Sequence, residues 1–218
     1  ETIESFLNVP NVRFELTSDN TIDVSQNSGT LTASFSAGTP ITFRTPAALL
    51  SFVSQFGFTQ STINFAAIDV ATTQITILGN GSPSNTTVNI NGPLNNTNGG
   101  FTVSQANVNI NAPVDVTGSF RIDDSTGSGL TTINAASIST GGIQNYFSPI
   151  QVSFDVSLTS QTGPILFQSA IDGANQLTVD GGASSVSFRG NVGATTPLAS
   201  LTVTGSAGIE QSITTSGD

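Results

Sequence analysis

A unit of strand-like sequence is written twice in succession between Ile165 and Gly205, and this duplication limits the fold more than any other feature. The second copy begins 21 residues after the first, and its apolar residues match in the pairs Ile165 and Val186, Phe167 and Phe188, and Ile171 and Val192. Both copies close with Leu-Thr-Val, at 177–179 and at 201–203. Apolar and polar residues alternate in each copy, which is the period of a half-buried strand. A short repeat made only of strands and turns predicts a solenoid, in which each turn of chain buries its apolar side against the next.

A second repeat lies earlier in the chain. Val88-Asn-Ile-Asn91 returns 20 residues later as Val108-Asn-Ile-Asn111, and a Gly-containing run that leads into Phe101 or Phe120 follows each copy. We expect the Val and Ile side chains to point inward and the Asn side chains to lie outside or at corners. There each Asn can hydrogen-bond its copy in the next turn, so that the amides form a ladder.

These repeats predict one β-solenoid segment over residues 1–218, with repeating turns from 31 to 218. Residues 1–30 are less regular, and we expect them to form a cap or an irregular start that covers the strand edges and apolar core at that end. The run from Ile150 to Leu158 alternates over nine residues and predicts one long strand. The turn spacing also permits an antiparallel β-sandwich.

One helix is expected to interrupt the solenoid around residues 46–56. Thr45 is a suitable N-cap, and Pro46 suits the first helical position. The apolar residues that follow fall at i, i+3, i+4 and i+7 on one face, namely Leu49, Phe52, Val53 and Phe56. Such a face either covers exposed core of the solenoid or docks onto a partner subunit, and the pattern leaves both interpretations open.

Composition argues against nucleic acid as a partner and against most enzyme classes. The chain has 14 carboxylates against four Arg, and its net charge of −10 repels phosphate. Neither His nor Cys is present, which removes neutral-pH proton shuttles, thiol nucleophiles and the Ser-His triad. Charged residues make up 8%, whereas soluble domains average about 25%, so Ser, Thr, Asn and Gln must cover the surface. No run of 18 apolar residues occurs, and we expect no membrane insertion.

Asp123 and Asp124 are the only adjacent carboxylates and therefore the first candidate for chemistry. Cleavage of a glycoside needs two converging carboxylates, whereas adjacent side chains in a strand point to opposite faces, so we predict no catalysis. Carboxylate oxygens suit calcium, and this pair is the candidate calcium site. An ordinary solvated turn explains the same residues, and no other cofactor is expected. Tyr146 and Phe147 are the aromatic neighbours that we expect to be exposed to a carbohydrate.

Residues 86–122 and 163–208 resemble the repeats of filamentous haemagglutinin-like adhesins and of other large bacterial surface β-helix proteins. The resemblance is carried by Gly100-Phe-Thr-Val with Val108-Asn-Ile-Asn-Ala-Pro113, and by Phe188-Arg-Gly-Asn-Val192 with the Leu-Thr-Val that follows it. It implies a right-handed parallel β-helix exported to the cell surface, with adhesive, matrix or filament roles. It brings no catalytic residues, because such repeats have none.

We therefore expect a non-enzymatic structural and adhesive module of a secreted bacterial surface protein or extracellular filament. Its expected partners are further copies, neighbouring domains of the same polypeptide, or surface glycans, reached by strand addition or hydrophobic docking. One alternative is a carbohydrate-binding or carbohydrate-cleaving β-helix, and another is a surface-layer β-sandwich. No signal peptide is recognisable, so we expect that one has been cleaved or that this is a segment of a longer protein.

Overall fold

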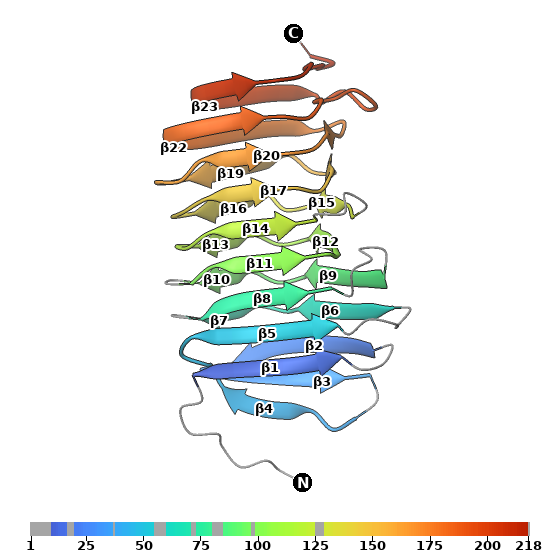
Figure 1. Cartoon of the computed structure of the whole chain (residues 1–218), viewed down its shortest axis with the longest axis vertical. Helices are drawn as coiled ribbons and strands as arrows, with labels where there is room; N and C mark the ends of the chain where they lie inside the picture. The colour runs from blue at the N-terminus through green and yellow to red at the C-terminus, as the bar shows by residue number, and fades with distance from the viewer. Residues whose placement is uncertain are drawn as a thin grey trace.

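The computed structural model describes residues 10–16, 20–36, 38–54, 60–70, 73–79, 85–96, 99–124 and 129–217. These residues form a parallel β-solenoid whose turns are stacked along the long axis, with the first strands at one end and β23 (Ser200–Ile209) at the other (Figure 1). Most turns contribute one strand to each of three faces, and the strands of a face pair in parallel with their equivalents in the adjacent turns.

The strands of each face follow one another up the stack. The first face consists of β1 (Asn11–Leu16), β5 (Leu49–Ser54), β8 (Gln74–Leu78), β11 (Phe101–Ser104), β14 (Phe120–Asp123), β17 (Gln144–Tyr146) and β20 (Ile165–Phe167). The second consists of β2 (Asn20–Asn27), β6 (Ser61–Phe65), β9 (Thr86–Ile90), β12 (Asn107–Ile110), β15 (Thr131–Ile133), β18 (Ile150–Val152) and β21 (Ile171–Asp172). The third consists of β7 (Ile68–Val70), β10 (Leu94–Asn96), β13 (Val114–Val116), β16 (Ser137–Thr140) and β19 (Val156–Ser160).

Two long strands, β22 (Gln176–Phe188) and β23 (Ser200–Ile209), join the third face to the first. The first part of β22 pairs with β19 and its last part pairs with β20. Strand β23 follows β22 along both parts, with a register shift between Asp180 and Ser185.

The pairings confirm both internal repeats. Ile165 pairs with Val186, and Leu177 pairs with Leu201. In the earlier repeat, Val88 pairs with Val108. Apolar residues at these positions form columns inside the solenoid, because equivalent side chains of successive turns lie about 4.8 Å apart. Gln144 interrupts the column of Ile165, and Thr131 interrupts the column of Val108. The fold is therefore the predicted parallel β-helix, and not the antiparallel β-sandwich that the turn spacing also permitted.

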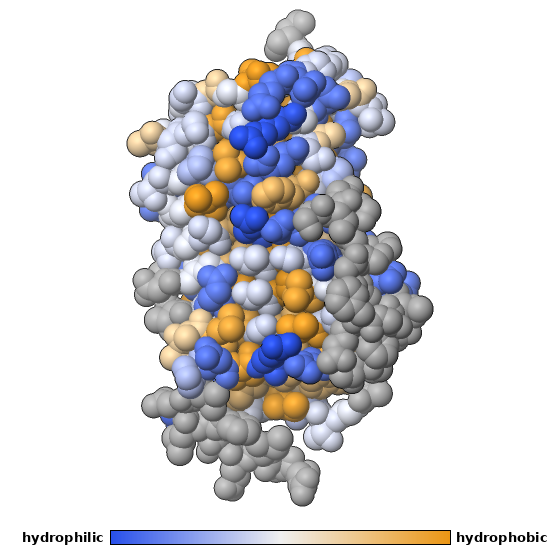
Figure 2. All heavy atoms as spheres, in the orientation of Figure 1, coloured by the Kyte–Doolittle hydropathy of each residue, from blue (hydrophilic) through white to orange (hydrophobic). Residues whose placement is uncertain are grey.

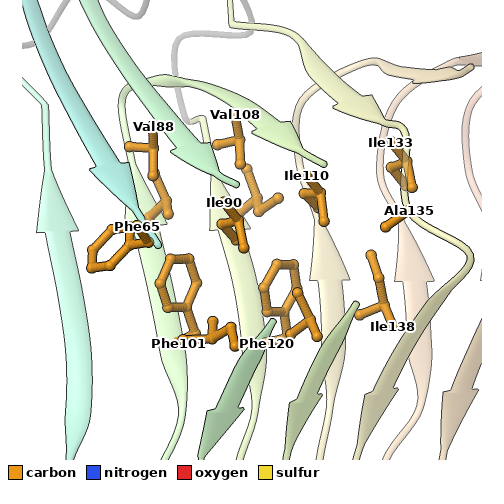
Figure 3. Close-up of a cluster of buried hydrophobic side chains, with 14 of the residues drawn as sticks. Phe65, Val88, Ile90, Phe101, Val108, Ile110, Phe120, Ile133, Ala135 and Ile138 are labelled. Atoms are coloured by element: carbon orange, nitrogen blue, oxygen red, sulfur yellow. The ribbon is translucent and has the colours of Figure 1, made fainter. Parts of the chain in front are cut away.

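The interior is filled by aliphatic columns and by a run of contacting aromatic rings. The close-up in Figure 3 shows Phe101 and Phe120 of the first face and Phe65 of the second pointing into the core, among Val and Ile side chains of the second and third faces. Ring centroids of successive aromatic residues lie 5.0 to 6.1 Å apart along the run Phe52, Phe65, Phe101, Phe120, Tyr146, Phe167 and Phe188. Offset and edge-to-face ring pairs at such distances stabilise a core beyond their buried area alone.

The helix expected around residues 46–56 is absent, and this prediction is wrong for the residues described. Leu49 to Ser54 form strand β5, which lies between β1 and β8 in the first face. Thr45 does not cap a helix, because its backbone N–H and its hydroxyl both donate to the carbonyl of Gly29. Two parallel ladders satisfy the backbone of this segment, and they outweigh its helical spacing of apolar residues.

The segment expected as a cap or irregular start is regular where it is described. Strands β1 and β2 pair in parallel with β5 and β6, so the solenoid turns begin before residue 31. The end of the second face is instead extended by β3 (Thr30–Phe35) and β4 (Ile41–Arg44), which pair antiparallel. Phe35 and Phe43 of this extension lie 5.9 and 5.5 Å from the ring of Phe14 and cover that end of the core.

The run from Ile150 to Leu158 forms two strands, β18 and β19, instead of the single long strand that its alternation predicts. Phe154 lies at the corner between them and is 53% exposed. Next to it, the Asp155 carboxylate accepts a 2.8 Å hydrogen bond from the backbone N–H of Gln176 in the following turn. The corner therefore interrupts the strand although the alternation continues through it.

Corners differ in length without disturbing the pairing of the strands beside them. Six positions lead from Ile171 to Leu177, and nine lead from Val192 to Leu201. Val192 nevertheless pairs with Ile171, and Leu201 pairs with Leu177. The longer corner absorbs three residues, and two of its backbone N–H groups donate to the Asp172 carboxylate at 2.8 and 3.0 Å.

Candidate functional site

The outer side of the second face carries a ladder of hydrogen-bonded polar side chains. Asn109 donates to Asn89 at 2.7 Å, Asn89 donates to Asn64 at 2.7 Å, and Asn64 donates to the carboxylate of Asp23 at 2.7 Å. A second ladder runs at the corner beyond this face, where Asn134 donates to Asn111 and Asn111 donates to Asn91, each at 2.8 Å. The expectation that each Asn bonds its copy is confirmed. The ladders use these amides for stability.

The candidate calcium residues are held by other protein groups. The Asp123 carboxylate lies 2.8 Å from the Arg121 guanidinium, whose carbon lies 4.8 Å from the ring centre of Phe147. Asp124 is 3% exposed, and its carboxylate accepts a 2.5 Å hydrogen bond from the backbone N–H of Gly129. The two carboxylates therefore do not form one open site, and calcium binding stays a prediction from the sequence.

Other carboxylates of the upper turns also bind backbone N–H groups, as Asp155 and Asp172 do at corners and as Asp180 does with Gly182 at 2.9 Å. Within the described ranges, no group of three or more His, Cys, Asp or Glu side chains is placed to hold a metal ion. These carboxylates stabilise corners, because hydrogen bonds to a charged acceptor are stronger than neutral ones.

The side chains predicted as a docking face do not form one. Phe52 points into the core, is fully buried and stacks on Phe14 with ring centroids 5.3 Å apart. Leu49 and Val53 are half-buried on the opposite, outer side of the same strand. Phe56 lies outside the described residues. A strand distributes these positions over two sides, whereas a helix would have collected them on one.

Tyr146 is not an exposed aromatic residue, and that expectation is wrong. Its side chain is fully buried, and burial raises the pKa of its phenol far above the ordinary value. Phe147, the next residue, is half-buried on the outside beneath Arg121. The pair therefore offers no aromatic platform to a carbohydrate.

A hollow of about 680 Å³ lies where the β2–β3 turn reaches the third face. The turn residues Ser28 and Gly29 both have positive φ, 49° and 79°, which is the backbone of a tight hairpin turn matched to strand twist. The Gln26 side chain fastens this hairpin to β7, because its amide donates to the Asp69 carbonyl at 2.6 Å and its oxygen accepts from the Asp69 N–H at 2.5 Å. Ala67 and Pro93 form the apolar part of the lining, since the Ile68 side chain is buried in the core.

Polar side chains of the third face extend this hollow into a short row. Asp69 pairs with Asn95 of the next turn, and Asn95 pairs with Asp115 of the turn after it. All three are exposed, and neighbouring members lie about 4.8 Å apart because they occupy adjacent parallel strands. No Arg is among the residues that line the hollow. The carboxylates of Asp69 and Asp115 make this row negatively charged, which disfavours acidic ligands.

This row was not predicted from the sequence, although the sequence contains a signal for it. Each member is the polar centre of a three-residue strand, in Ile68-Asp-Val70, Leu94-Asn-Asn96 and Val114-Asp-Val116. The spacing of 26 and then 20 residues hides the repeat. The hairpin that turns the row into a hollow comes from β2 and β3, far away in the sequence.

Comparisons of the chain with models of protein families, with curated proteins and with solved structures found no match. In the part of the chain that the structure describes, no helix has the length and apolar character needed to cross a membrane. On the face shown in Figure 2, apolar residues are dispersed in small groups among polar ones.

Proposed function

We propose that this chain is a non-catalytic structural and adhesive module of a secreted bacterial surface protein or extracellular filament. The observation that supports it is the continuous parallel ladder of the first face, which runs from β1 to β22. Each turn rests on the one below through backbone hydrogen bonds and core columns, so the molecule resists bending. Stiffness along one axis is the property that a surface rod or filament needs.

The side-chain chemistry supports the same role. Amides bond to amides along the second face, and carboxylates bind backbone N–H groups at corners. The remaining outer surface is rich in Ser and Thr, as on β16, β19 and β23 of the third face. Such a surface is hydrated and nearly neutral locally, and it suits contact with hydrated polymers at a cell surface.

The proposal is tested by asking whether the chain binds polysaccharides without cleaving them. The purified chain is immobilised and exposed to a panel of neutral and acidic polysaccharides, and both retention and release of reducing ends are measured. We expect retention of some neutral polymers and no release of ends. Turnover of any polymer, abolished by unfolding the chain, would contradict the non-catalytic proposal.

Carbohydrate binding in the hollow is a second candidate function, and the row of Asp69, Asn95 and Asp115 favours it. These side chains can accept hydrogen bonds from sugar hydroxyls while Pro93 and Ala67 contact the apolar side of a sugar ring. D69A and N95A are expected to weaken retention of a neutral glycan about tenfold each. Thr159 occupies the same outer column several turns away, through Asp115, Ser139 and Thr159, so T159A is the control. Equal loss in all three variants would exclude the hollow.

A further inference from the structure

Two carboxylates on the outer side of the third face are not used by the fold. Asp69 and Asp115 are exposed, and within the described residues neither carboxylate has a hydrogen-bond or ion-pair partner. The Gln26 side chain binds Asp69 only at its backbone. Every other Asp side chain in the described part of the chain binds a backbone N–H, an Asn amide or Arg121. The two free charges are therefore available to a ligand.

These two carboxylates lie in one column, two turns apart. Asp69 pairs with Asn95, and Asn95 pairs with Asp115. Neighbouring parallel strands are about 4.8 Å apart, so the Cα atoms of the two Asp residues are separated by about 9.6 Å along the solenoid axis. The Asn95 side chain lies between them and is exposed. The row therefore offers a charge, a neutral polar group and a second charge at equal intervals.

An apolar strip runs beside this column. Ala67, Pro93 and Pro113 are exposed, and each lies two positions before a member of the row, on the same side of its strand. The backbone N–H of Leu94 donates to the Pro113 carbonyl at 3.0 Å, which places the two prolines in successive turns. Apolar side chains next to a few polar groups suit a sugar ring, which has apolar faces and a polar rim.

We propose that the row binds an extended chain of β-1,4-linked amino sugars laid along the solenoid axis, with one end in the hollow. Successive sugars of such a chain face opposite sides, so amino groups on one side recur once per disaccharide, a length close to two turn spacings. Two of these amines can therefore meet Asp69 and Asp115, while Asn95 bonds a hydroxyl between them. The proposal rests on the second candidate function, carbohydrate binding in the hollow, and adds the charge of the ligand.

The spacing of the row favours a sugar chain over a basic peptide. Side chains on one side of an extended peptide recur about every 6.8 Å, which is twice the rise of about 3.4 Å per residue. Two successive Lys on that side would not align with both Asp69 and Asp115. The net charge of −10 attracts either kind of cation, so charge alone does not distinguish them.

Chemical-shift titration by NMR tests both the location of the site and its preference for charge. Tetrasaccharides of β-1,4-linked glucosamine, N-acetylglucosamine and glucose share one linkage and differ at carbon 2, which carries an amine, an amide or a hydroxyl. In mildly acidic buffer the amine is protonated. We expect the glucosamine chain to shift the backbone amides of Asp69, Asn95 and Asp115 and to bind about tenfold more tightly than the glucose chain. Added salt should reduce this preference, because it screens exposed charges.

Variants that remove only charge test the two carboxylates. D69N and D115N each keep a side chain of the same size with an acceptor oxygen. Each should lower the affinity for the glucosamine chain about threefold and leave the affinity for the glucose chain nearly unchanged. D180N is the matched control, because Asp180 lies in the same outer column, beyond Thr159, and its carboxylate binds the backbone of Gly182. Circular dichroism verifies that each variant remains folded.

Three results would overturn the amino-sugar proposal. Equal affinity for the glucose and glucosamine chains would do so and would leave carbohydrate binding in the hollow standing. Equal loss of affinity in D180N would show that the charge of the whole molecule acts, and not the row. Binding of tetralysine as tightly as the glucosamine chain would show attraction of any cation. If no tetrasaccharide shifts the row, both this proposal and carbohydrate binding in the hollow are wrong.

Discussion

The hydroxyl group of Tyr146 donates a 2.9 Å hydrogen bond to the side-chain oxygen of Gln144, and both side chains are completely buried. The amide of Gln144 donates in turn to the carbonyls of Ile138 and Thr159, at 3.1 and 2.7 Å. In the adjacent turns, Phe120 and Ile165 occupy the column of Gln144. A polar pair therefore replaces apolar residues at one level of the core, and its hydrogen bonds make that replacement tolerable.

Replacing Tyr146 by Phe should lower the free energy of unfolding by about 1–3 kcal/mol, because the buried oxygen of Gln144 loses its donor. Urea denaturation measures the change. In the double variant Y146F/Q144L both polar partners are gone, so its loss should be smaller than the sum of the two single losses. Strict additivity would mean that the two side chains do not act as a pair.

Alkaline pH should destabilise the protein through the same tyrosine. Burial raises the pKa of Tyr146 in the folded state, so the native protein keeps a proton that the unfolded chain releases above about pH 10. Stability from this group is thus complete below that pH and declines as pH rises further. Tyr146 is the only tyrosine and Trp is absent, so phenolate absorbance reports on this one residue. Ionisation near pH 10 in the folded protein would refute the buried state, and Y146F should lose less stability at high pH.

The Asn ladder of the second face should respond to substitution according to the number of bonds removed. N89A breaks two amide hydrogen bonds and should cost about 1–2 kcal/mol, whereas N134A breaks one bond at the end of the other ladder and should cost about half as much. Asn95 has an exposed side chain outside both ladders, and N95A should stay within about 0.5 kcal/mol of the parent. Thermal and urea unfolding measure all three. Equal values would show that the ladders contribute nothing.

The turns approach so closely at Gly190 that a methyl group does not fit. A Cβ there would lie 2.2 Å from the carbonyl carbon of Ser169 and 2.6 Å from the backbone nitrogen of Ala170, both in the turn below. G190A should therefore cost about 2 kcal/mol or more through displaced backbone. Gly208 has its nearest neighbour at 4.0 Å, so G208A is the control and should be nearly neutral. A neutral G190A would mean that the two turns separate easily.

Sequence repeats were sufficient to predict the stacking of turns, because equivalent residues must coincide when a chain coils upon itself. The pairing of Ile165 with Val186 and of Asn89 with Asn109 follows from that requirement. The local spacing of apolar residues predicted secondary structure less well where it fits both the helical and the strand period. Leu49, Phe52 and Val53 fit a helix, but the alternation of Leu50 and Phe52 also fits a strand, and the ladders on both sides of β5 decide between them.

The corners and the long-range contacts could not be predicted from the sequence. The alternation from Ile150 to Leu158 continues through a bend, because Phe154 and Asp155 happen to keep the pattern while pointing outward. The hollow depends on a hairpin that reaches a strand 43 residues away, from Gln26 to Asp69. Neither feature leaves a periodic trace, and only the folded arrangement reveals them.

The longer corner between Val192 and Leu201 has a consequence for engineering. Three additional residues there leave the strands on both sides in step with the turn below. Foreign peptides grafted into this corner would project from the solenoid and leave its strand pairing intact. Lengthening a loop adds little to the entropic cost of closing it once its ends are fixed. The molecule thus provides a rigid scaffold that can present epitopes or binding loops at fixed positions along the solenoid axis.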